Sequence, residues 1–468
     1  MPITPQHPTT LPDQLAQKIG KLIDQGLLKA GHRLPSIRAA AIEYGVAKNT
    51  VVEAYERLVA LGYVRAQQGS GFFISKVAQK SQDSRLPHIV QAVDMIWLLR
   101  EQLEQHYAVR IGDGRPPQAW MEGSELGRHL RPLELKKRPV GEGYSTPLGY
   151  APLRERIAVM LNDRSMKVST SQILLTEGAN HALDLLIRHL TKPGDVVLVD
   201  SPGYYPLFGK LSLAMVTAVG VRRTPEGPDP EELAATAEHT KAKVFFTQSL
   251  AQNPTGNSIS IASAHRVLQV ASRYGIRVVD DDPFSDLFPA VTPRLAALDQ
   301  LEQVLQVGTF AKTLSAGLRS GYIAAAEKDI DQLTDLKMLT MVNSSGYVER
   351  VVSDLIVSGQ YRRHLSRLRE RIEKATASTT VALNNLGMKV FGAPSGGYYL
   401  WSELPPEIDE IELAKRAAEE GIFLAPGSIF YPDRKVVAPA MRVNIAYGQD
   451  PRFGDFYKHY LKAHSSDR

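Results

Sequence analysis

The chain of 468 residues contains no cysteine. Disulfide bonds and thiolate metal sites are therefore excluded, which fits a reducing cytoplasm. No apolar stretch approaches the roughly 20 residues of a membrane-spanning helix, and VDMIWLL is among the most apolar. The opening MPITPQHPTT has neither a basic nor an apolar stretch, so we expect no secretory signal. We accordingly expect a cytoplasmic protein with no membrane partner, and no pattern predicts a metal site.

The chain also has little excess of positive over negative charge. The net charge is +5, and 43% apolar with 22% charged residues is ordinary for a globular protein. The length suggests two to three domains. Residues 1–75 carry 8 Lys and Arg against 5 Asp and Glu, a net of +3, whereas the other 393 residues carry 47 against 45. A mildly basic first segment is compatible with nucleic acid but does not alone indicate it.

The first 75 residues predict three helices. Ser36 is placed to cap a second helix, IRAAAIEY, which Gly45 ends. A third helix is expected from about Lys48 to Leu61, with Gly62 at its end. The apolar residues of the first helix are Leu11, Leu15, Ile19, Leu22 and Ile23, with Gly26 as a stop. The buried side of the third helix is expected to hold Val51, Val52, Tyr55, Leu58 and Val59.

Two short β-type runs follow, YVRAQQ and FFIS, joined through a Gly-Ser-Gly turn that is typical of a hairpin. Helices across a tight turn followed by a hairpin predict a winged helix-turn-helix over residues 8–75. The third helix of such a domain enters the major groove with its N-terminus first.

The stretch from Leu11 to Ser75 resembles the DNA-binding domain of the GntR family of transcription regulators along nearly its whole length. The family usually has Ser or Thr where this chain has Ala47, and losing that N-cap is expected to cost about 1 kcal/mol. Taken one by one, the basic residues could also be ordinary exposed charges. The resemblance implies double-stranded DNA as a partner, with contacts from Arg38, Lys48, Asn49 and Thr50, and from Gly69 and Ser70 at the wing.

Residues 76–109 are expected to form a linker that contains an amphipathic helix over 88–106. That helix could pack on the second domain or on a partner chain, and the sequence leaves both open.

From about residue 145, helical patterns alternate with short β-branched runs. Continuous apolar runs of this kind predict an α/β fold with a mostly parallel sheet buried on both faces. Ligands in such sheets lie beyond the carboxyl ends of the strands. The runs are 173–176, 196–199, 214–221, 243–247, 276–280, 304–308 and 322–326.

Groups suited to a phosphate follow two of these runs. Gly178, Ala179 and Asn180 open a helix, whose free N–H groups favour an anion. Thr309 adds a hydroxyl and Arg319 adds a fixed positive charge.

Groups suited to an aromatic aldehyde follow the neighbouring runs. Tyr204 offers an aromatic face, Asp281 can keep a ring nitrogen protonated, and Asn253 can donate to a ring oxygen. Lys312 supplies an amine for a Schiff base. Each residue alone has an ordinary explanation, such as a turn, a helix cap or a surface charge. Together they predict the cofactor pyridoxal 5′-phosphate.

Residues from roughly 110 to 460 resemble a fold-type I, class I/II aminotransferase domain, through NPTG, DDDPF, TFAKTLSAGLRSGY, PSGGYYLW, LAPGSIFY and MRVN. The resemblance implies a PLP-dependent transferase fold over 110–468, with a smaller C-terminal α+β subdomain and a homodimer. It also implies that Arg442 pairs with an effector carboxylate and that Tyr144 reaches the phosphate of the partner subunit's cofactor. The family usually has Tyr where this chain has Phe284, which puts fast transamination in doubt; Tyr322 or another hydroxyl could compensate.

The order of the two domains resembles the MocR subfamily of regulators. The resemblance implies a DNA-binding regulator that responds to pyridoxal 5′-phosphate or to an amino compound forming an external aldimine. Two alternatives stay open at this point. One is an active aminotransferase with an accessory DNA-binding domain, and the other is a dimerisation body without cofactor.

Overall fold

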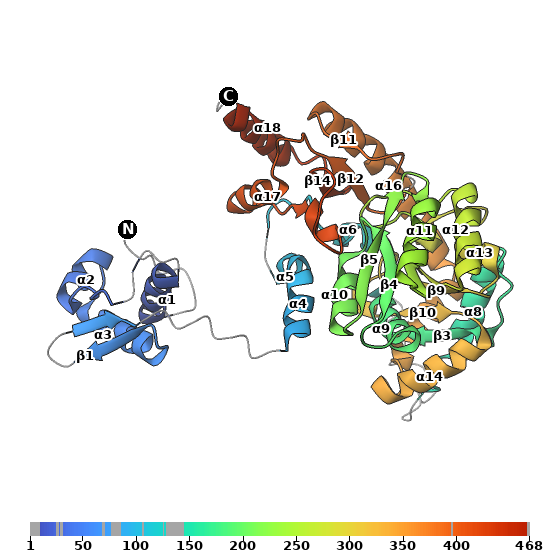
Figure 1. Ribbon diagram of the computed structural model, residues 1–468, viewed down its shortest axis with the longest axis horizontal. Coiled ribbons are helices and arrows are strands. Elements are labelled where there is room, and N and C mark those ends of the chain that lie inside the picture. Colours follow the sequence, from blue (N-terminus) through green and yellow to red (C-terminus); the bar gives the residue numbers. More distant parts are fainter. Residues whose placement is uncertain are drawn as a thin grey trace. The chain divides into compact units, whose positions relative to one another are not determined.

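The computed structural model describes residues 10–24, 28, 31–67, 71–75, 86–104, 107–124, 126–127, 145–394 and 396–465. The chain divides into two compact units, Met1–Val90 and Gln91–Arg468 (Figure 1). Each unit has its own hydrophobic core. Among the described residues, no helix is both long and apolar enough to cross a membrane.

The first unit is a winged helix-turn-helix, which confirms the prediction. Its hairpin is antiparallel, with Val64 opposite Ile74. Side chains from all three helices and both strands form the core. The elements are α1 (Leu11–Asp24), α2 (Ile37–Tyr44), α3 (Lys48–Ala60), β1 (Val64–Gln67) and β2 (Gly71–Ile74).

Local signals set the ends of α2 and α3. The Ser36 hydroxyl accepts a hydrogen bond from the Ala39 N–H at 3.2 Å, and Gly45 ends α2 with φ of 68°. Ala47 precedes α3 and supplies no side-chain acceptor. The predicted buried side of α3 was partly wrong. Val52 and Val59 are half-buried, and Ala54 takes the core position beside Val51, Tyr55 and Leu58 because it lies on the same helical face.

The second unit contains an eight-stranded sheet in the order β3-β10-β9-β8-β7-β4-β5-β6. Every predicted run forms a strand. β4, β5, β7, β8 and β9 are parallel, whereas β10 is antiparallel to both β3 and β9. The bounds are β3 (Ile173–Thr176), β4 (Val196–Ser201), β5 (Thr217–Thr224), β6 (Gly227–Pro228), β7 (Val244–Thr247), β8 (Arg277–Asp282), β9 (Val304–Thr309) and β10 (Gly321–Ala324).

Helices cover both faces of this sheet (Figure 1). Alternate residues of a strand enter different cores, as Leu198 does on one side and Val197 and Val199 do on the other. The helices are α8 (Ala151–Asn162), α9 (Ala179–Leu190), α10 (Tyr205–Leu213), α11 (Pro230–Thr240), α12 (Ile261–Tyr274), α13 (Leu295–Asp299), α14 (Glu327–Met341), α15 (Gly346–Val357) and α16 (Gln360–Asn385).

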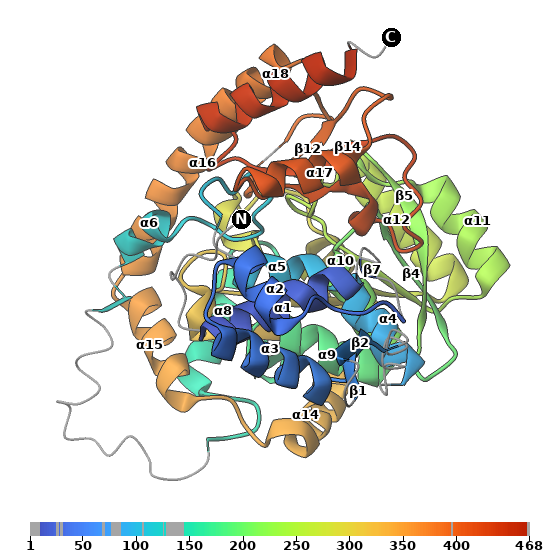
Figure 2. The same cartoon turned by 90° about the vertical axis from the view of Figure 1, so that its left-hand side faces the viewer.

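A smaller antiparallel sheet follows, in the order β11-β12-β14-β13. Figure 2 shows α17 and α18 beside β12 and β14. This is the expected C-terminal α+β subdomain. Its elements are β11 (Lys389–Val390), β12 (Tyr399–Glu403), α17 (Glu410–Glu419), β13 (Ala425–Pro426), β14 (Ala440–Asn444) and α18 (Pro451–Ser465).

The helix predicted over 88–106 is two helices, α4 (Pro87–Met95) and α5 (Trp97–Glu104), which meet at Ile96. A short helix α6 (Gln118–Met121) comes next. Leu98 of α5 is buried in the core of the second unit. The residues from Gln91 onward therefore pack on the second unit, which was one of the two possibilities left open.

Candidate functional site

The carboxyl ends of neighbouring parallel strands meet at one edge of the large sheet and place polar side chains there. They border a cavity of about 160 Å³. It is lined by Arg115, Pro116, Ala179, Asn180, Tyr204, Gln248, Asn253, Asp281, Pro283, Phe284, Thr309, Ala311, Lys312, Ala316, Arg319 and Tyr399. Most of the predicted cofactor residues therefore meet in one place.

Lys312 follows β9 and presents its amine to the cavity. Its Nζ donates to the carbonyl oxygen of Gly114 at 2.6 Å. The Tyr399 hydroxyl donates to the same oxygen at 2.7 Å. The Tyr398 hydroxyl donates to the Lys312 carbonyl at 2.8 Å and fixes the backbone at this point. One carbonyl thus gathers an amine and a phenol.

Asp281 lies at the end of β8 with one carboxylate oxygen in use. Gln248 Nε2 donates to its Oδ2 at 2.7 Å, while Oδ1 has no hydrogen-bond partner among the described residues. Burial raises the pKa of Asp281 to about 6, against the lowering effect of the Gln248 hydrogen bond. A protonated ring nitrogen at Oδ1 would satisfy the free oxygen and neutralise the buried charge.

The N-terminus of α9 forms an anion cradle beside the cavity. Gly178 caps the helix with φ of +77° and no side chain does so. A Cβ at Gly178 would lie 3.0 Å from Arg319 Nη2, so a side chain there would crowd the guanidinium in addition to straining the positive φ. Arg319 Nη2 donates to the Glu177 carbonyl at 3.1 Å, and Ala311 N–H donates to Thr309 Oγ1 at 3.2 Å. Helix N–H groups, a guanidinium and a hydroxyl fit a phosphate.

Arg442 is a buried cation that has no carboxylate partner among the described residues. Its side chain is 1% exposed, and Nη1 donates to Asn253 Oδ1 at 3.1 Å while Nη2 donates to the Gly112 carbonyl at 2.8 Å. Its guanidinium lies over the rings of Tyr399 and Phe430 at 4.9 and 5.1 Å. Its Nε has no partner in the described part of the chain. A buried charge of this kind favours an anionic ligand.

Sequence reasoning missed Gln248, Tyr399 and Arg115. Gln248 joins two predicted residues, because its Oε1 also accepts from the Asn253 N–H at 2.8 Å. Gln248 directly follows β7, and that position was the available signal. Tyr399 stands inside the quoted motif PSGGYYLW, and nothing marked its hydroxyl.

Not every predicted residue can be placed in the cavity. Tyr144, Gly69 and Ser70 lie outside the described residues. Gly178 borders the cavity through Arg319 rather than lining it. Arg442 does not line the cavity either. The segment 112–114 lies against its guanidinium, and a Cβ at Gly114 would be 3.1 Å from Arg442 Nη2.

Phe284 is fully buried, with its ring edge-on to Tyr398 and Tyr399 at 5.5 and 5.9 Å. Tyr322 packs against Phe310 and does not line the cavity. The phenol that shares an acceptor with Lys312 is that of Tyr399.

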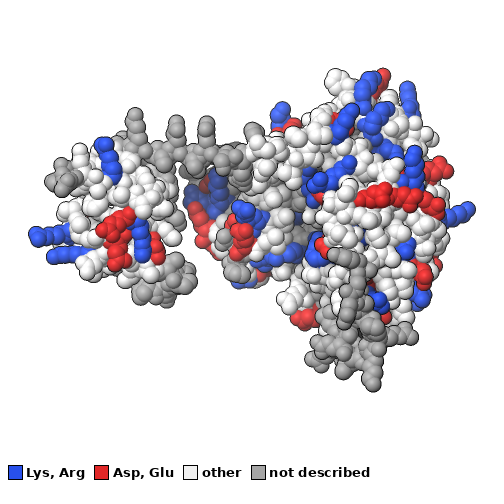
Figure 3. Space-filling view, turned by 90° about the horizontal axis from the view of Figure 1, so that it is seen from below, with Lys and Arg blue, Asp and Glu red and all other residues white. Residues whose placement is uncertain are grey.

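The four predicted DNA contacts that the structure describes belong to the first unit. Arg38 of α2 and Lys48 and Asn49 of α3 are exposed, and Thr50 is half-buried. Arg33 and Arg65 are exposed on the same unit. Figure 3 shows basic side chains projecting from this domain. The uncapped N-terminus of α3 adds N–H groups that suit a phosphate.

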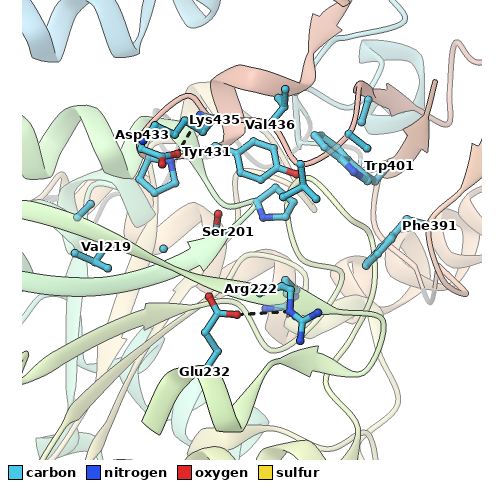
Figure 4. Close-up of a pocket in the computed structure, with 18 of the residues that line it drawn as sticks. Ser201, Val219, Arg222, Glu232, Phe391, Trp401, Tyr431, Asp433, Lys435 and Val436 are labelled. Atoms are coloured by element: carbon cyan, nitrogen blue, oxygen red, sulfur yellow. Dashed lines mark hydrogen bonds and ion pairs between the residues drawn. The ribbon is translucent and has the colours of Figure 1, made fainter. Parts of the chain in front are cut away.

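A larger cavity of about 750 Å³ lies elsewhere, between β5 and the loop 431–440 (Figure 4). Phe391, Trp401 and Tyr431 line it, and Arg222 pairs there with Glu232 at 3.5 Å. It contains none of the predicted site residues, so size does not identify the functional site.

Two family descriptions match the chain. "Aminotransferase class I and II" matches residues 111–453, and "Bacterial regulatory proteins, gntR family" matches residues 11–74. The chain belongs to the aminotransferase class I and II family. It joins that domain to a GntR-type helix-turn-helix domain.

Known proteins resemble both parts. The protein named "Uncharacterized HTH-type transcriptional regulator YdfD" of Bacillus subtilis (strain 168) is 27% identical over 90% of each chain. The HTH-type transcriptional regulator NorG of Staphylococcus aureus (strain USA300) is 26% identical, over 86% of this chain and 94% of its own. The crystal structure of Pyrococcus horikoshii kynurenine aminotransferase gives a TM-score of 0.72 at 25% identity, over 83% of this chain and 97% of its own.

Proposed function

We propose that the protein is a DNA-binding transcription regulator of the MocR type, whose second domain binds pyridoxal 5′-phosphate at Lys312. The observation that carries this proposal is the presence, in one chain, of a winged helix-turn-helix and a cavity that unites Lys312, Asp281 and Arg319. Two relatives that align over 90% and 86% of this chain are named as HTH-type transcriptional regulators.

The residues of the cavity fit this cofactor group by group. Asp281 Oδ1 would hold the ring nitrogen, and Asn253 would donate to the ring oxygen. Tyr204 would stack on the ring. Gly178, Ala179, Asn180, Thr309 and Arg319 would hold the phosphate. When bound, the cofactor supplies an aldehyde that condenses with primary amines.

The effector is the cofactor itself or an amino compound that replaces Lys312 on the aldehyde. Arg442 favours an amino compound that also carries a carboxylate, because its buried guanidinium has no carboxylate partner among the described residues. Such a ligand shifts DNA affinity only if it binds two arrangements of the protein with different affinity.

A homodimer is part of the proposal. Helix-turn-helix proteins read paired half-sites, and a two-fold dimer supplies two reading heads. Tyr144 is proposed to complete the phosphate site of the partner subunit's cofactor.

An active aminotransferase is the second candidate, favoured by the nearly complete cavity and by the likeness to a solved aminotransferase. Phe284 counts against it, because no phenol stands at that position. Steady turnover of an amino donor and a keto acid at roughly 1 s⁻¹ or more would establish it. Conversion of one cofactor per subunit and no more leaves the regulator proposal in place.

The test combines cofactor attachment and DNA binding. Borohydride reduction of the protein mixed with pyridoxal 5′-phosphate is expected to leave a pyridoxyl tag on the peptide that contains Lys312. Absence of the tag, or an absorbance spectrum that Lys312→Ala leaves unchanged, would favour a dimerisation body without cofactor. A duplex from upstream of the protein's own gene is expected to bind; no binding with or without cofactor would reject the regulator.

A further inference from the structure

The segment 109–115 connects the cavity to α5. It runs beside the small sheet, where Gly112 N–H donates to the Phe423 carbonyl at 2.8 Å and Asn444 N–H donates to the Ile111 carbonyl at 2.7 Å. A Cβ at Gly112 would lie 2.4 Å from the Ala425 nitrogen, so the backbones touch there. The segment is therefore held closely on one side, while the carbonyl groups of Gly112 and Gly114 accept from Arg442 and Lys312.

Two carbonyl groups of this segment occupy the donors that a ligand needs. Gly114 accepts from Lys312 Nζ, and Gly112 accepts from Arg442 Nη2. A cofactor at Lys312 and a carboxylate at Arg442 would compete with these two bonds. Ligand binding and the present position of the segment thus oppose each other.

Gln102 fastens the same segment to α5. It is 3% exposed, and its Oε1 accepts from the Gly114 N–H at 3.0 Å. Its carbonyl oxygen accepts from Arg110 Nη2 at 2.8 Å and from Arg115 Nη2 at 2.9 Å. Gly114 is therefore bonded through its carbonyl to the cavity and through its N–H to α5.

A second connection leads from the cavity to α4. Tyr204, which lines the cavity, directly precedes α10. In the middle of α10, a Cβ at Gly209 would lie 2.8 Å from Ile96 Cγ2 and 3.2 Å from the Ala92 carbonyl oxygen. The backbones of α4 and α10 are in contact at this point, so a shift of one helix displaces the other.

We propose that α4 and α5 carry the state of the cavity toward the DNA-binding domain, with Gln102 as the positioning residue. The proposal rests on the proposed function, because it needs a cofactor at Lys312. The covalent path is short: α5 follows α4, and the boundary between the two units, after Val90, falls within α4.

The chemistry of condensation supplies the switch. A neutral amine that condenses with an aldehyde gives both of its hydrogens to the water that leaves. The nitrogen afterwards carries at most one N–H, taken from water, in a direction fixed by the new double bond. The present Lys312–Gly114 hydrogen bond is then lost, and the Gly114 carbonyl keeps only the Tyr399 hydroxyl as a donor among the described residues, so Gly114 is held less firmly and can shift with Gln102 and α5.

Amide hydrogen exchange of the full-length protein tests this directly. Pyridoxal 5′-phosphate is expected to speed exchange about fivefold in residues 97–104 and at Gly114, as loss of one hydrogen bond does. Lys312→Ala without cofactor is expected to show the fast rate already. In Gln102→Ala, exchange is expected to be fast and unaffected by the cofactor, and the effect of cofactor on DNA affinity is expected to vanish.

Two variants serve as controls. Gln91→Ala changes the same residue type at an exposed position of α4 and is expected to behave as the wild type. Gln102→Glu keeps an oxygen acceptor for the Gly114 N–H and is expected to restore the response. A merely structural role for Gln102 would change stability without removing the difference between loaded and free protein.

The outcomes separate the two proposals. In one outcome, the wild-type protein gains the visible absorbance of the condensed cofactor but amide exchange in residues 97–104 does not change. That result overturns the role of α5 and leaves the proposed function standing. Absence of that absorbance rejects the proposed function itself. Should Gln102→Ala fail to fold, the comparison of Lys312→Ala with loaded wild type still decides, since unequal rates in 97–104 contradict the proposal.

Discussion

Three aspartates stand in a row on β8, and only the middle one faces the cavity. Asp280 accepts from the Ser249 hydroxyl at 2.6 Å and from its N–H at 2.9 Å, and Asp282 lies 4.0 Å from Arg294. Side chains alternate along a strand, so Asp281 points the other way and lines the cavity. The same alternation shows why one carboxylate can serve a ligand while its neighbours serve the core.

Asp281→Asn is predicted to make the cofactor-free protein more stable above pH 6. The folded-state pKa of Asp281 is about 6, above its ordinary value, so wild-type stability falls as pH rises from about 4 to about 6. Asparagine removes this loss, worth at most about 3 kcal/mol. Urea unfolding at pH 5 and pH 8 measures the difference.

Cofactor affinity supplies the second readout for this variant. Asp281→Asn is expected to weaken pyridoxal 5′-phosphate binding at least tenfold, since a neutral amide does not hold a protonated ring nitrogen. Asp280→Asn is the matched control, because burial raises the pKa of Asp280 to about 7 and its side chain binds Ser249 instead. Equal cofactor affinity in the two variants would contradict the assignment of Asp281.

At the scale of elements, α3 and α10 each have a small residue at a position where it does not favour helix stability. α3 begins after Ala47 without a side-chain cap, although its N-terminus is the part expected to meet DNA. α10 has a glycine at its closest approach to α4. At both positions the small residue lowers the intrinsic stability of the helix. In α10 it allows close contact with α4, and before α3 it leaves N–H groups that suit a DNA phosphate.

Ala47→Ser is predicted to stabilise α3 by about 1 kcal/mol, because a hydroxyl can accept from an N–H of the first turn. Exchange of the α3 amides is expected to slow about fivefold. Ala60→Ser, at the exposed C-terminal end of the same helix, has no free N–H to accept from and is expected to change little. Equal slowing in both variants would refute the capping explanation.

The same glycine-to-alanine substitution is predicted to have opposite effects in two helices. Gly20→Ala in α1 places its Cβ no closer than 3.8 Å to Tyr63 and is expected to stabilise the first unit by about 0.5–1 kcal/mol. Gly209→Ala meets Ile96 at 2.8 Å and is expected to destabilise the packing of α4 by about 1–3 kcal/mol. Thermal unfolding of the full chain checks the signs, and a stabilising Gly209→Ala would argue against tight packing.

At the scale of the whole molecule, a reading domain and a ligand domain share one chain but have separate cores. We therefore expect the connecting elements to carry any signal from one unit to the other. The charge distribution follows the same division, because the excess of positive charge is concentrated in the first 75 residues.

DNA affinity is predicted to depend on salt through the first unit. Arg38→Ala and Lys48→Ala are each expected to lower affinity and to reduce the slope of log K against log salt by about 1, since each removes one phosphate contact. Fluorescence anisotropy with a labelled duplex at several salt concentrations measures the slope. Arg266→Ala removes one exposed charge from α12 and is the control with the same net charge; an equal loss of slope there would point to net charge alone.

Much of the fold was predictable from the sequence. Apolar runs that alternate with helical patterns predicted seven strands, and all seven form. The prediction worked because a strand buried on both faces is a continuous apolar run in the sequence. No local pattern in the sequence indicated that β10 lies between β3 and β9 or that it runs antiparallel to them. The break at Ile96 was also missed, because apolar spacing continues across it.

The sequence by itself determined the two domains, the strand ends and the set of residues gathered there, since these follow from patterns within a few residues of each other. Only the tertiary structure decided which groups have partners. Among the described residues, Asp281 keeps one free oxygen and Arg442 lacks a carboxylate, and Gly114 binds an amine 198 positions away. Contacts over such separations depend on how the chain folds back on itself, and no local spacing encodes that.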